Sequence, residues 1–292
     1  MTEQLTWFVT GCSSGLGEEL VRAILSRGDQ VIATARASNG ISGAQRLAAL
    51  EKAGAAVLEL DTTASPAELN AKAKEAWSIY GQVDVLVNNA GYIEAAVVEE
   101  MDDDLLNNSL RTNVHGPLNM TRAFLPLMRA RGSGTVLFSG TLGVYHGAPG
   151  ASPYTASKAL LDALVPNLAI EIASFGLRVS MLVYGHFRTN VMAPGRIQHR
   201  ASHALPEYAE LNRLVREGCA AVNGNQPGDP KKACGLIVEA VRGEGRCAGK
   251  QLPLRLPIGS DAFQRLRENA AEKTRMCDEW EGITLETNVE TA

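Results

Sequence analysis

Short, nearly continuous apolar runs alternate with helix-like segments along most of this chain. Such runs are typical of strands that are covered on both faces, as they are in parallel sheets. The expected strands are residues 5–9, 30–34, 55–60, 83–87, 134–138, 177–183 and 252–256. The expected helices are residues 16–27, 44–52, 66–80, 102–131, 154–175, 230–241 and 261–279. This alternation predicts an α/β fold in which a single doubly wound parallel sheet carries helices on both faces.

The composition is that of an ordinary globular chain, and it limits the class of partner. Of the 292 residues 45% are hydrophobic and 21% are charged, which suits one domain over residues 1–292. The net charge is -4 and no basic block is present, so we expect no nucleic acid partner. No apolar run approaches the roughly 20 residues of a membrane helix, so no membrane partner is expected. The polar first residues show no signal peptide.

The cysteines bear on compartment and on metals. Cys12, Cys219, Cys234, Cys247 and Cys277 show neither CxxC pairing nor metal-ligand spacing. We therefore expect reduced thiols, a cytoplasmic location and no metal site.

Two segments do not follow the alternation of strands and helices. Residues 185–228 have no strong period, and so long a connection within a compact domain is often a lid over a substrate. Its apolar side chains, among them Phe187, Met192 and Tyr208, favour a mainly hydrophobic ligand. Residues 282–292 are polar and are expected to form a loose tail.

Residues of chemical interest follow the ends of the expected strands, which meet at one edge of a parallel sheet where ligands bind. They are residues 11–17, 36, 61, 88–91, 139–141 and 185–189. Gly11, Gly15 and Gly17 lie between a strand and a helix, where glycine lets the backbone approach a diphosphate at the helix N-terminus. Their spacing differs from G-x-G-x-x-G, and a glycine-rich turn without a ligand is the alternative.

Tyr154 and Lys158 are four residues apart and would project from one face of a helix. An ammonium beside a phenol stabilises the phenolate and lowers the tyrosine pKa from its ordinary value of about 10. A tyrosine tuned in this way can exchange a proton with an alcohol near neutral pH. The alternative is a solvent-facing pair with no chemical role.

Four motifs, in order, resemble those of the single-domain short-chain dehydrogenases/reductases. They are Thr10-Gly-x-x-x-Gly-x-Gly17, Asn88-Asn-Ala-Gly91, Asn113-Val-His-Gly116 and Tyr154-x-x-x-Lys158. The resemblance spans residues 5–256, and residues 187–190 and 257–262 look like those of fungal members. It implies a Rossmann-like sheet with strand order 3-2-1-4-5-6-7 and a nicotinamide cofactor.

The resemblance also implies roles for single residues. Tyr154 would be the general acid/base, Lys158 would lower its pKa and hold the nicotinamide ribose, and Asn113 would hold a water that relays the proton. An amide that bonds a neighbouring strand is the alternative for Asn113. Asp61 would bind the adenine, or serve only as a turn residue. The other residues expected at the cofactor are Ser13, Leu16, Asn89, Ala90, Gly91, Gly185 and Thr189.

Cofactor choice depends on the residue that follows the second strand. An NAD site usually carries an acidic side chain there, which binds the ribose 2′-OH. Ala35 occupies that place and Arg36 follows it, and a guanidinium suits a 2′-phosphate. Ser14 would add a hydroxyl donor. We therefore expect NADP(H); the alternative is that Arg36 is only a surface residue.

Two positions depart from the family pattern. The family has a serine thirteen residues before the tyrosine, and this chain has Thr141 there. A threonine hydroxyl can also hold a substrate carbonyl, and Ser139 is the second candidate for that role. Tyr184 replaces the usual proline at the end of the sixth strand, where it would shape the pocket or simply pack.

The predicted function is that of an NADP-dependent oxidoreductase, a ketoreductase or secondary-alcohol dehydrogenase for a mainly apolar small molecule, with a role in secondary metabolism. Reduction is the favoured direction, because an untuned phenol stays protonated at neutral pH. A homodimer or homotetramer is expected, with helices 102–131 and 154–175 paired across a two-fold axis. The alternatives are a catalytically idle protein with NADP as a structural ligand, and a non-redox isomerase or cyclase.

Overall fold

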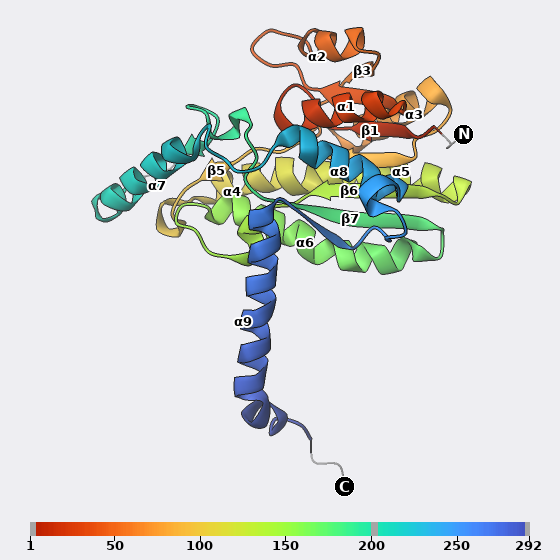
Figure 1. The fold of residues 1–292 in the computed structure, drawn as a ribbon. Coiled ribbons are helices and arrows are strands. Elements are labelled where there is room, and N and C mark those ends of the chain that lie inside the picture. The colour runs from red at the N-terminus through yellow and green to blue at the C-terminus, as the bar shows by residue number, and fades with distance from the viewer. Residues whose placement is uncertain (1–3, 200–203, 290–292) are drawn as a thin grey trace.

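The structure, a computed structural model, describes residues 4–199 and 204–289. Its centre is a seven-stranded sheet in the order β3-β2-β1-β4-β6-β7-β9, with every pairing parallel (Figure 1). Counted along the chain, these seven strands have the order 3-2-1-4-5-6-7, so the predicted fold is confirmed. The strands are β1 (Thr6–Val9), β2 (Gln30–Ala35), β3 (Ala56–Glu59), β4 (Val85–Asn88), β6 (Gly134–Ser139), β7 (Leu177–Tyr184) and β9 (Arg255–Ile258).

Helices cover both faces of the sheet, because successive side chains of a strand point to opposite faces. In β1, Trp7 and Val9 enter the core under α1, α2 and α8, whereas Phe8 enters the core under α3, α5 and α6. In the described part of the chain no helix combines the length and the apolar character needed to cross a membrane. The covering helices are α1 (Gly15–Arg27), α2 (Gly43–Lys52), α3 (Pro66–Tyr80), α5 (Gly116–Arg131), α6 (Ser152–Ala173) and α8 (Pro230–Arg242).

The helix predicted over residues 102–131 is interrupted. It starts as α4 (Asp103–Leu110), passes through a π-helical turn (Arg111–His115) and continues as α5. Such a turn accommodates an extra residue per hydrogen bond, and it is frequent at functional sites. Here it directs Asn113 and Val114 into the interior, where both are buried.

The C-terminal elements differ from the sequence-based expectation. The last strand was expected at residues 252–256 and is β9, whose register pairs Met181 with Arg255 and Tyr184 with Ile258. The last helix, α9 (Ser260–Leu285), does not end at residue 279 but runs through Gly282, because a single glycine weakens a helix without necessarily ending it. The prediction of a loose tail from residue 282 is therefore wrong as far as Leu285, and residues 290–292 lie outside the described residues.

Residues 185–228, the predicted lid, contain secondary structure of their own. β8 (Gln198–His199) pairs with β5 (Glu94–Ala95) in a small separate sheet. α7 (Ala209–Val222) lies at the edge of the molecule, on the left of Figure 1. Two 3-10 turns, Asn190–Met192 and Pro206–Tyr208, complete the segment. The lid role itself stays a prediction.

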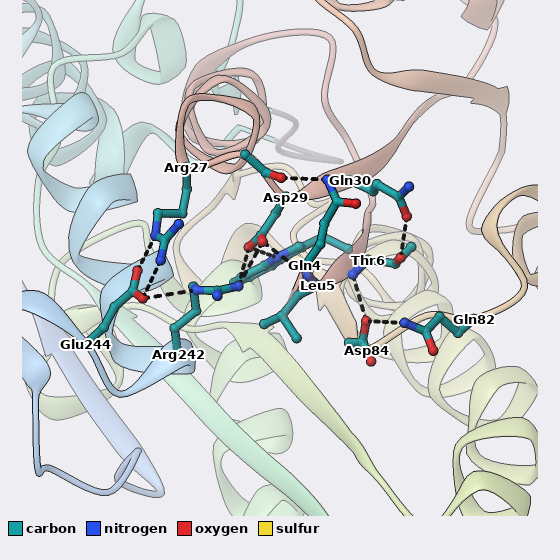
Figure 2. A network of polar contacts seen from close by, with 12 residues as sticks. Gln4, Leu5, Thr6, Arg27, Asp29, Gln30, Gln82, Asp84, Arg242 and Glu244 are labelled. Atoms are coloured by element: carbon teal, nitrogen blue, oxygen red, sulfur yellow. Dashed lines mark hydrogen bonds and ion pairs between the residues drawn. The ribbon is translucent and has the colours of Figure 1, made fainter. Parts of the chain in front are cut away.

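A polar network ties the amino edge of the sheet to α1 and α8 (Figure 2). Asp29 accepts hydrogen bonds from Trp7 Nε1 at 3.0 Å and from Arg242 Nη1 at 2.8 Å. The side chains of Asp29 and Arg242 are only 2% and 6% exposed. Arg242 also pairs with Glu244, which Arg27 contacts in turn. Because an unpaired buried charge is costly, this pair locks the start of β2 to the end of α8.

Asp29→Asn is expected to lower the free energy of unfolding by about 3 kcal/mol, because it removes the more deeply buried of the two carboxylates that pair with the Arg242 guanidinium. Urea denaturation followed by circular dichroism measures the change. Arg213→Ala is the control, since Arg213 pairs with Glu210 and Glu217 on the exposed surface of α7 and its loss should cost less than about 1 kcal/mol. Equal losses in the two variants would contradict the assignment.

Candidate active site

A cavity of about 680 Å³ lies at the carboxyl ends of the strands, and nearly all of the predicted site residues line it. The exception is Asn113, which is fully buried behind the cavity wall. The predicted residues that line the cavity are Gly11, Ser13, Ser14, Gly15, Leu16, Gly17, Arg36, Asp61, Asn89, Ala90, Gly91, Ser139, Thr141, Tyr154, Lys158, Gly185 and Thr189.

The loop between β1 and α1 packs its backbone against the end of β4. Gly11 and Gly15 have φ angles of +73° and +65°, in the region that favours glycine. A Cβ on Gly17 would lie 2.4 Å from the Gly11 carbonyl oxygen and 2.5 Å from Asn89 Nδ2. Asn89 Nδ2 donates to the carbonyl oxygens of Thr10 at 2.9 Å and Gly11 at 3.1 Å. Close packing therefore requires glycine at Gly11, where a Cβ would lie 2.8 Å from Ala90 Cα, and at Gly17, whereas the positive φ favours glycine at Gly15.

The first turn of α1 opens into the cavity and has the character of an anion site. Ser14 is the N-cap residue, but its side chain makes no capping hydrogen bond. The N–H groups of the first turn therefore carry the positive end of the helix dipole without a side-chain acceptor. On the other side of the loop, a Cβ on Gly15 would lie 3.8 Å from Thr189 Cβ. This bare backbone cradle fits the diphosphate of a dinucleotide.

Two arginines, Arg36 and Arg46, lie near the end of β2, whereas the sequence analysis predicted only Arg36 at the cofactor. Arg36 is exposed and lines the cavity. Arg46 donates from Nη1 to the Arg36 carbonyl oxygen at 2.8 Å and from Nη2 to Ser13 Oγ at 2.9 Å. Within residues 4–199 and 204–289, neither guanidinium has a carboxylate partner. Sequence reasoning missed Arg46, although the capping box of Ser42 and Gln45 places it in the first turn of α2, beside the loop.

Asp61 lies at the end of β3 and has a structural partner of its own. Its Oδ1 accepts hydrogen bonds from Thr63 N–H at 2.8 Å and from Thr63 Oγ1 at 2.7 Å. These hydrogen bonds are typical of a turn that an aspartate stabilises. A turn residue was the alternative to the adenine contact in the sequence analysis. Asp61 is nevertheless exposed and lines the cavity, so the predicted contact with adenine stays a prediction.

Tyr154 and Lys158 lie one turn apart on α6, with Lys158 Nζ 5.9 Å from the centroid of the Tyr154 ring. Lys158 is 4% exposed, and its Nζ donates to the Ser139 carbonyl oxygen at 2.8 Å. Burial lowers the pKa of Lys158 to about 8. Burial also raises the pKa of Tyr154 to about 12, against a smaller lowering by a hydrogen bond with Thr141. The net shift of the Tyr154 pKa is therefore opposite to the predicted direction, because desolvation outweighs the influences that favour the phenolate.

The side chain that lies near the Tyr154 hydroxyl is that of Thr141 and not that of Ser139. The Thr141 side chain lies near the Tyr154 hydroxyl and acts to lower the pKa of that phenol, and its Oγ1 accepts the Gly143 N–H at 3.2 Å. Ser139 Oγ is buried beside the Tyr184 phenol without a hydrogen bond of good geometry. The geometry thus favours Thr141 as the hydroxyl that meets a substrate oxygen, and the role itself stays a prediction.

Asn113 binds the segment that follows β4. Its Nδ2 donates to the Tyr92 carbonyl oxygen at 3.0 Å and to Ser157 Oγ at 3.1 Å, and its Oδ1 accepts the Tyr92 N–H at 3.1 Å. A Cβ on Gly91 would lie 3.0 Å from Asn113 Oδ1 and 3.5 Å from Lys158 Nζ. Glycine therefore lets the amide and the ammonium approach each other. The bonds to Tyr92 match the alternative raised from the sequence, and the role in holding a water stays a prediction.

The turn after β7 depends on Asp261, a residue that sequence reasoning did not single out. A Cβ on Gly185 would lie 1.9 Å from Asp261 Oδ1, and Asp261 Oδ2 accepts the His186 N–H at 2.7 Å. Tyr184, just before this turn, packs edge-on against Phe187 with ring centroids 6.0 Å apart. Burial raises the pKa of Tyr184. The tyrosine therefore packs, and it also lines the cavity.

Comparisons of the sequence support a single family. A model of the short chain dehydrogenase family matches residues 6–199. Oxidoreductase BOA17 of Botryotinia fuckeliana is 31% identical over 279 residues, which cover 96% of this chain and 97% of that protein. The 3-oxoacyl-[acyl-carrier-protein] reductase FabG of Salmonella typhimurium is 30% identical over 218 residues, which cover 75% of this chain and 84% of that protein.

Comparisons of the structure agree. A short-chain dehydrogenase from Streptomyces avermitilis has a TM-score of 0.82 and 34% identity, covering 99% of this chain and 100% of that chain. A variant of actinorhodin polyketide ketoreductase with NADPH has a TM-score of 0.69 and 27% identity, covering 87% and 95%. The parallel sheet, the glycine loop and the strand-end cavity are those of a Rossmann-like oxidoreductase. The chain belongs to the short-chain dehydrogenase/reductase family, so the predicted family is confirmed.

Proposed function

We propose that this protein is an NADPH-dependent ketoreductase that acts on a mainly apolar small molecule. One observation carries the proposal: the glycine loop, Arg36, Thr141 and Tyr154 all line the same cavity. A dinucleotide that lies along the strand ends, with its diphosphate at the first turn of α1, would bring its nicotinamide beside the two hydroxyl groups.

In the proposed reaction, side chains of the protein bind the substrate carbonyl oxygen and supply a proton to it. The reduced nicotinamide supplies the hydride when bound. Thr141 Oγ1 donates a hydrogen bond to the carbonyl oxygen, and Tyr154 transfers its hydroxyl proton to that oxygen as negative charge develops on it. A pKa of about 12 keeps Tyr154 protonated at neutral pH, so reduction is the favoured direction. Lys158, with a pKa of about 8, still carries its charge there and stabilises the phenolate that remains.

We assign NADP(H) rather than NAD(H) to this cavity. Arg36 and Arg46 both line the cavity near the end of β2, and neither guanidinium has a carboxylate partner among the described residues; the Ser13 hydroxyl of the loop accepts a hydrogen bond from Arg46. A 2′-phosphate would accept charge-assisted hydrogen bonds from both. Ala35 offers no carboxylate for a free ribose 2′-OH. The NADPH in the similar ketoreductase structure supports the same choice.

The proposed substrate class rests on the apolar side chains that the predicted lid contributes to the cavity wall, although His186, Asn190 and Arg196 of the same segment also line the cavity and Tyr208 does not. FabG and the polyketide ketoreductase are named as reductases of acyl and polyketide groups, which supports a ketone on an apolar skeleton. The apolar residues of the predicted lid that line the cavity are Phe187, Val191, Met192, Ile197 and Val215.

A buried carboxylate anchors the proposed lid to the body of the protein. Glu100 is 1% exposed, and it accepts hydrogen bonds from Leu205 N–H at 2.8 Å and from Asn212 Nδ2 at 2.8 Å. Leu205 and Asn212 flank the start of α7. We propose that α7 moves about this anchor as a lid over the substrate.

Two further proposals concern the cell and the assembly. All five cysteines are free, which suits a reducing compartment such as the cytoplasm. α6 exposes Leu160 (40%), Leu164 (36%) and Ile170 (80%). A second copy in a homodimer or homotetramer would cover this apolar area.

The redox proposal is tested by following NADPH absorbance with a panel of apolar ketones. Tyr154→Phe is expected to lose about 100-fold or more in rate, because it removes the proton donor, while NADPH still binds. Tyr145→Phe is the matched control and should keep the wild-type rate, since the Tyr145 hydroxyl donates to Asp162 Oδ1 at 2.9 Å, outside the cavity. Tight NADPH binding without turnover of any ketone would instead support the idle or non-redox alternative.

Arg36→Asp is expected to lower the preference for NADPH over NADH, expressed as the ratio of kcat/KM values, by about 10- to 100-fold. The carboxylate would repel the 2′-phosphate and accept the 2′-OH of NADH. Lys52→Asp, the same change of charge at the exposed end of α2, is the control and should leave the ratio as it is. An unchanged ratio in Arg36→Asp would rule out this assignment.

Thr141→Val is expected to lower kcat by about 100-fold, because it removes a hydrogen-bond donor to the substrate oxygen and keeps the side-chain shape. Ser139→Ala should change kcat by less than about threefold, since its hydroxyl is not oriented by a hydrogen bond. The dissociation constant of NADPH should be similar in both variants. A loss confined to Ser139→Ala would transfer the role to that residue.

A further inference from the structure

Gln226 is a buried amide in the wall of the active-site cavity, and the sequence analysis did not single it out. It lies between α7 and α8, lines the cavity and is 1% exposed. In the part of the chain that the structure describes, neither its Nε2 nor its Oε1 has a hydrogen-bond partner. A buried amide without partners destabilises the folded state. Because Gln226 lines the cavity, a bound ligand can supply the missing partners.

The backbone around Gln226 is fixed to the turn that follows β7. The Gln226 carbonyl oxygen accepts a hydrogen bond from Arg188 Nη2 at 3.2 Å. Phe187 pairs with Gly228 in a parallel bridge. This register places Gln226, two residues before the bridge, alongside Gly185. The position of Gln226 at the cavity is therefore set by the backbone and not by its own amide group.

The turn after β7 also lies close to the first turn of α1, where the diphosphate of the cofactor is proposed to bind. A Cβ on Gly15 would lie 3.8 Å from Thr189 Cβ. Cys234 Sγ, on α8, donates to the Leu16 carbonyl oxygen at 3.6 Å. A dinucleotide that reaches from the first turn of α1 to Tyr154 therefore passes this turn with its nicotinamide end.

The chemistry of the Gln226 side chain fits the carboxamide of a nicotinamide. An amide side chain offers N–H donors and a carbonyl acceptor, and both ends of Gln226 are unpaired among the described residues. A carboxamide presents the complementary carbonyl and amino groups side by side, so it forms two hydrogen bonds at once. A ketone oxygen only accepts, and it would leave Gln226 Oε1 buried without a donor. Exchange of the oxygen and nitrogen positions of Gln226 leaves this match unchanged.

We propose that Gln226 pairs with the carboxamide of the nicotinamide and thereby orients the ring. Its Nε2 donates to the carboxamide oxygen, and its Oε1 accepts an N–H of the amino group. The two hydrogen bonds fix the rotation of the ring, and hence the face that the ring turns toward a substrate beside Tyr154. Gln226 takes no part in hydride or proton transfer. This inference rests on the proposed cofactor site and does not depend on the proposed reduction of a ketone.

The test compares NADP⁺ with its acetylpyridine analogue, in which a methyl group replaces the amino group of the carboxamide. Isothermal titration calorimetry measures both dissociation constants without turnover. The wild type is expected to bind NADP⁺ about tenfold more tightly than the analogue, because the analogue leaves Gln226 Oε1 without a donor. Gln226→Leu should bind NADP⁺ about tenfold more weakly than the wild type does, and it should bind NADP⁺ and the analogue equally. Gln264→Leu, at an exposed position of α9, is the control and should keep the wild-type preference.

Urea unfolding of the nucleotide-free protein separates a ligand-binding role of Gln226 from a structural one. A structural role predicts that Gln226→Leu lowers the free energy of unfolding. The proposal predicts an unchanged or higher value, because an apolar group of similar size replaces an unpaired buried amide.

Any of three outcomes would overturn the proposal. The first is a wild type that binds NADP⁺ and the analogue equally, and this comparison needs no variant to fold. The second is a Gln226→Leu protein that keeps the wild-type preference for NADP⁺. The third is an unchanged NADP⁺ constant together with a raised KM for a ketone, which would assign Gln226 to the substrate. If no ketone is reduced but Gln226→Leu loses the preference, the proposed function fails and this inference stands.

Discussion

The close approach of the glycine loop to the end of β4 is the constraint on which the site depends. Thr10 Oγ1 accepts the N–H groups of Asn89 at 3.0 Å and Ala90 at 2.9 Å, and the Asn89 amide returns two bonds to the loop. The loop and the strand end therefore hold each other, and no side chain fits between them at Gly17. As a result the positive end of α1 faces the cavity, at a fixed place relative to the neighbouring strand ends.

The two edges of the sheet use charge in opposite ways. At the amino edge, Asp29 and Arg242 are buried as a pair, and this arrangement contributes to stability. At the carboxyl edge, Arg36 and Arg46 have no carboxylate partners among the described residues, and the Lys158 ammonium is buried against a backbone carbonyl. A buried cation without a counter-charge, such as Lys158, is costly to the folded state, whereas the exposed Arg36 is solvated by water. They become favourable once an anion binds, which is why such groups gather at sites rather than in cores.

Much of the fold and part of the site follow from local patterns in the chain. Apolar runs of strand length, helical periods and glycines at strand ends each reflect a short-range rule. Together they predicted the parallel sheet and the edge at which Gly11, Arg36 and Asp61 meet, and the resemblance to the family added the strand order and Tyr154. The boundaries of the last strand and of the last helix were predicted wrongly, because pairing with β7 places the strand at Arg255–Ile258 and the helix continues to Leu285.

By itself the sequence determined the family, the layered α/β architecture and part of the cavity's lining, since these depend on residue type and spacing. Only the tertiary structure decided how those residues interact. In the folded chain Arg46 donates a hydrogen bond to Ser13, and Lys158 donates to the Ser139 carbonyl oxygen. Asp261 packs against Gly185. The tertiary structure also reversed the expected direction of the Tyr154 pKa shift. Such outcomes depend on burial and on contacts between distant segments, and no local pattern in a sequence encodes how much water a folded chain excludes.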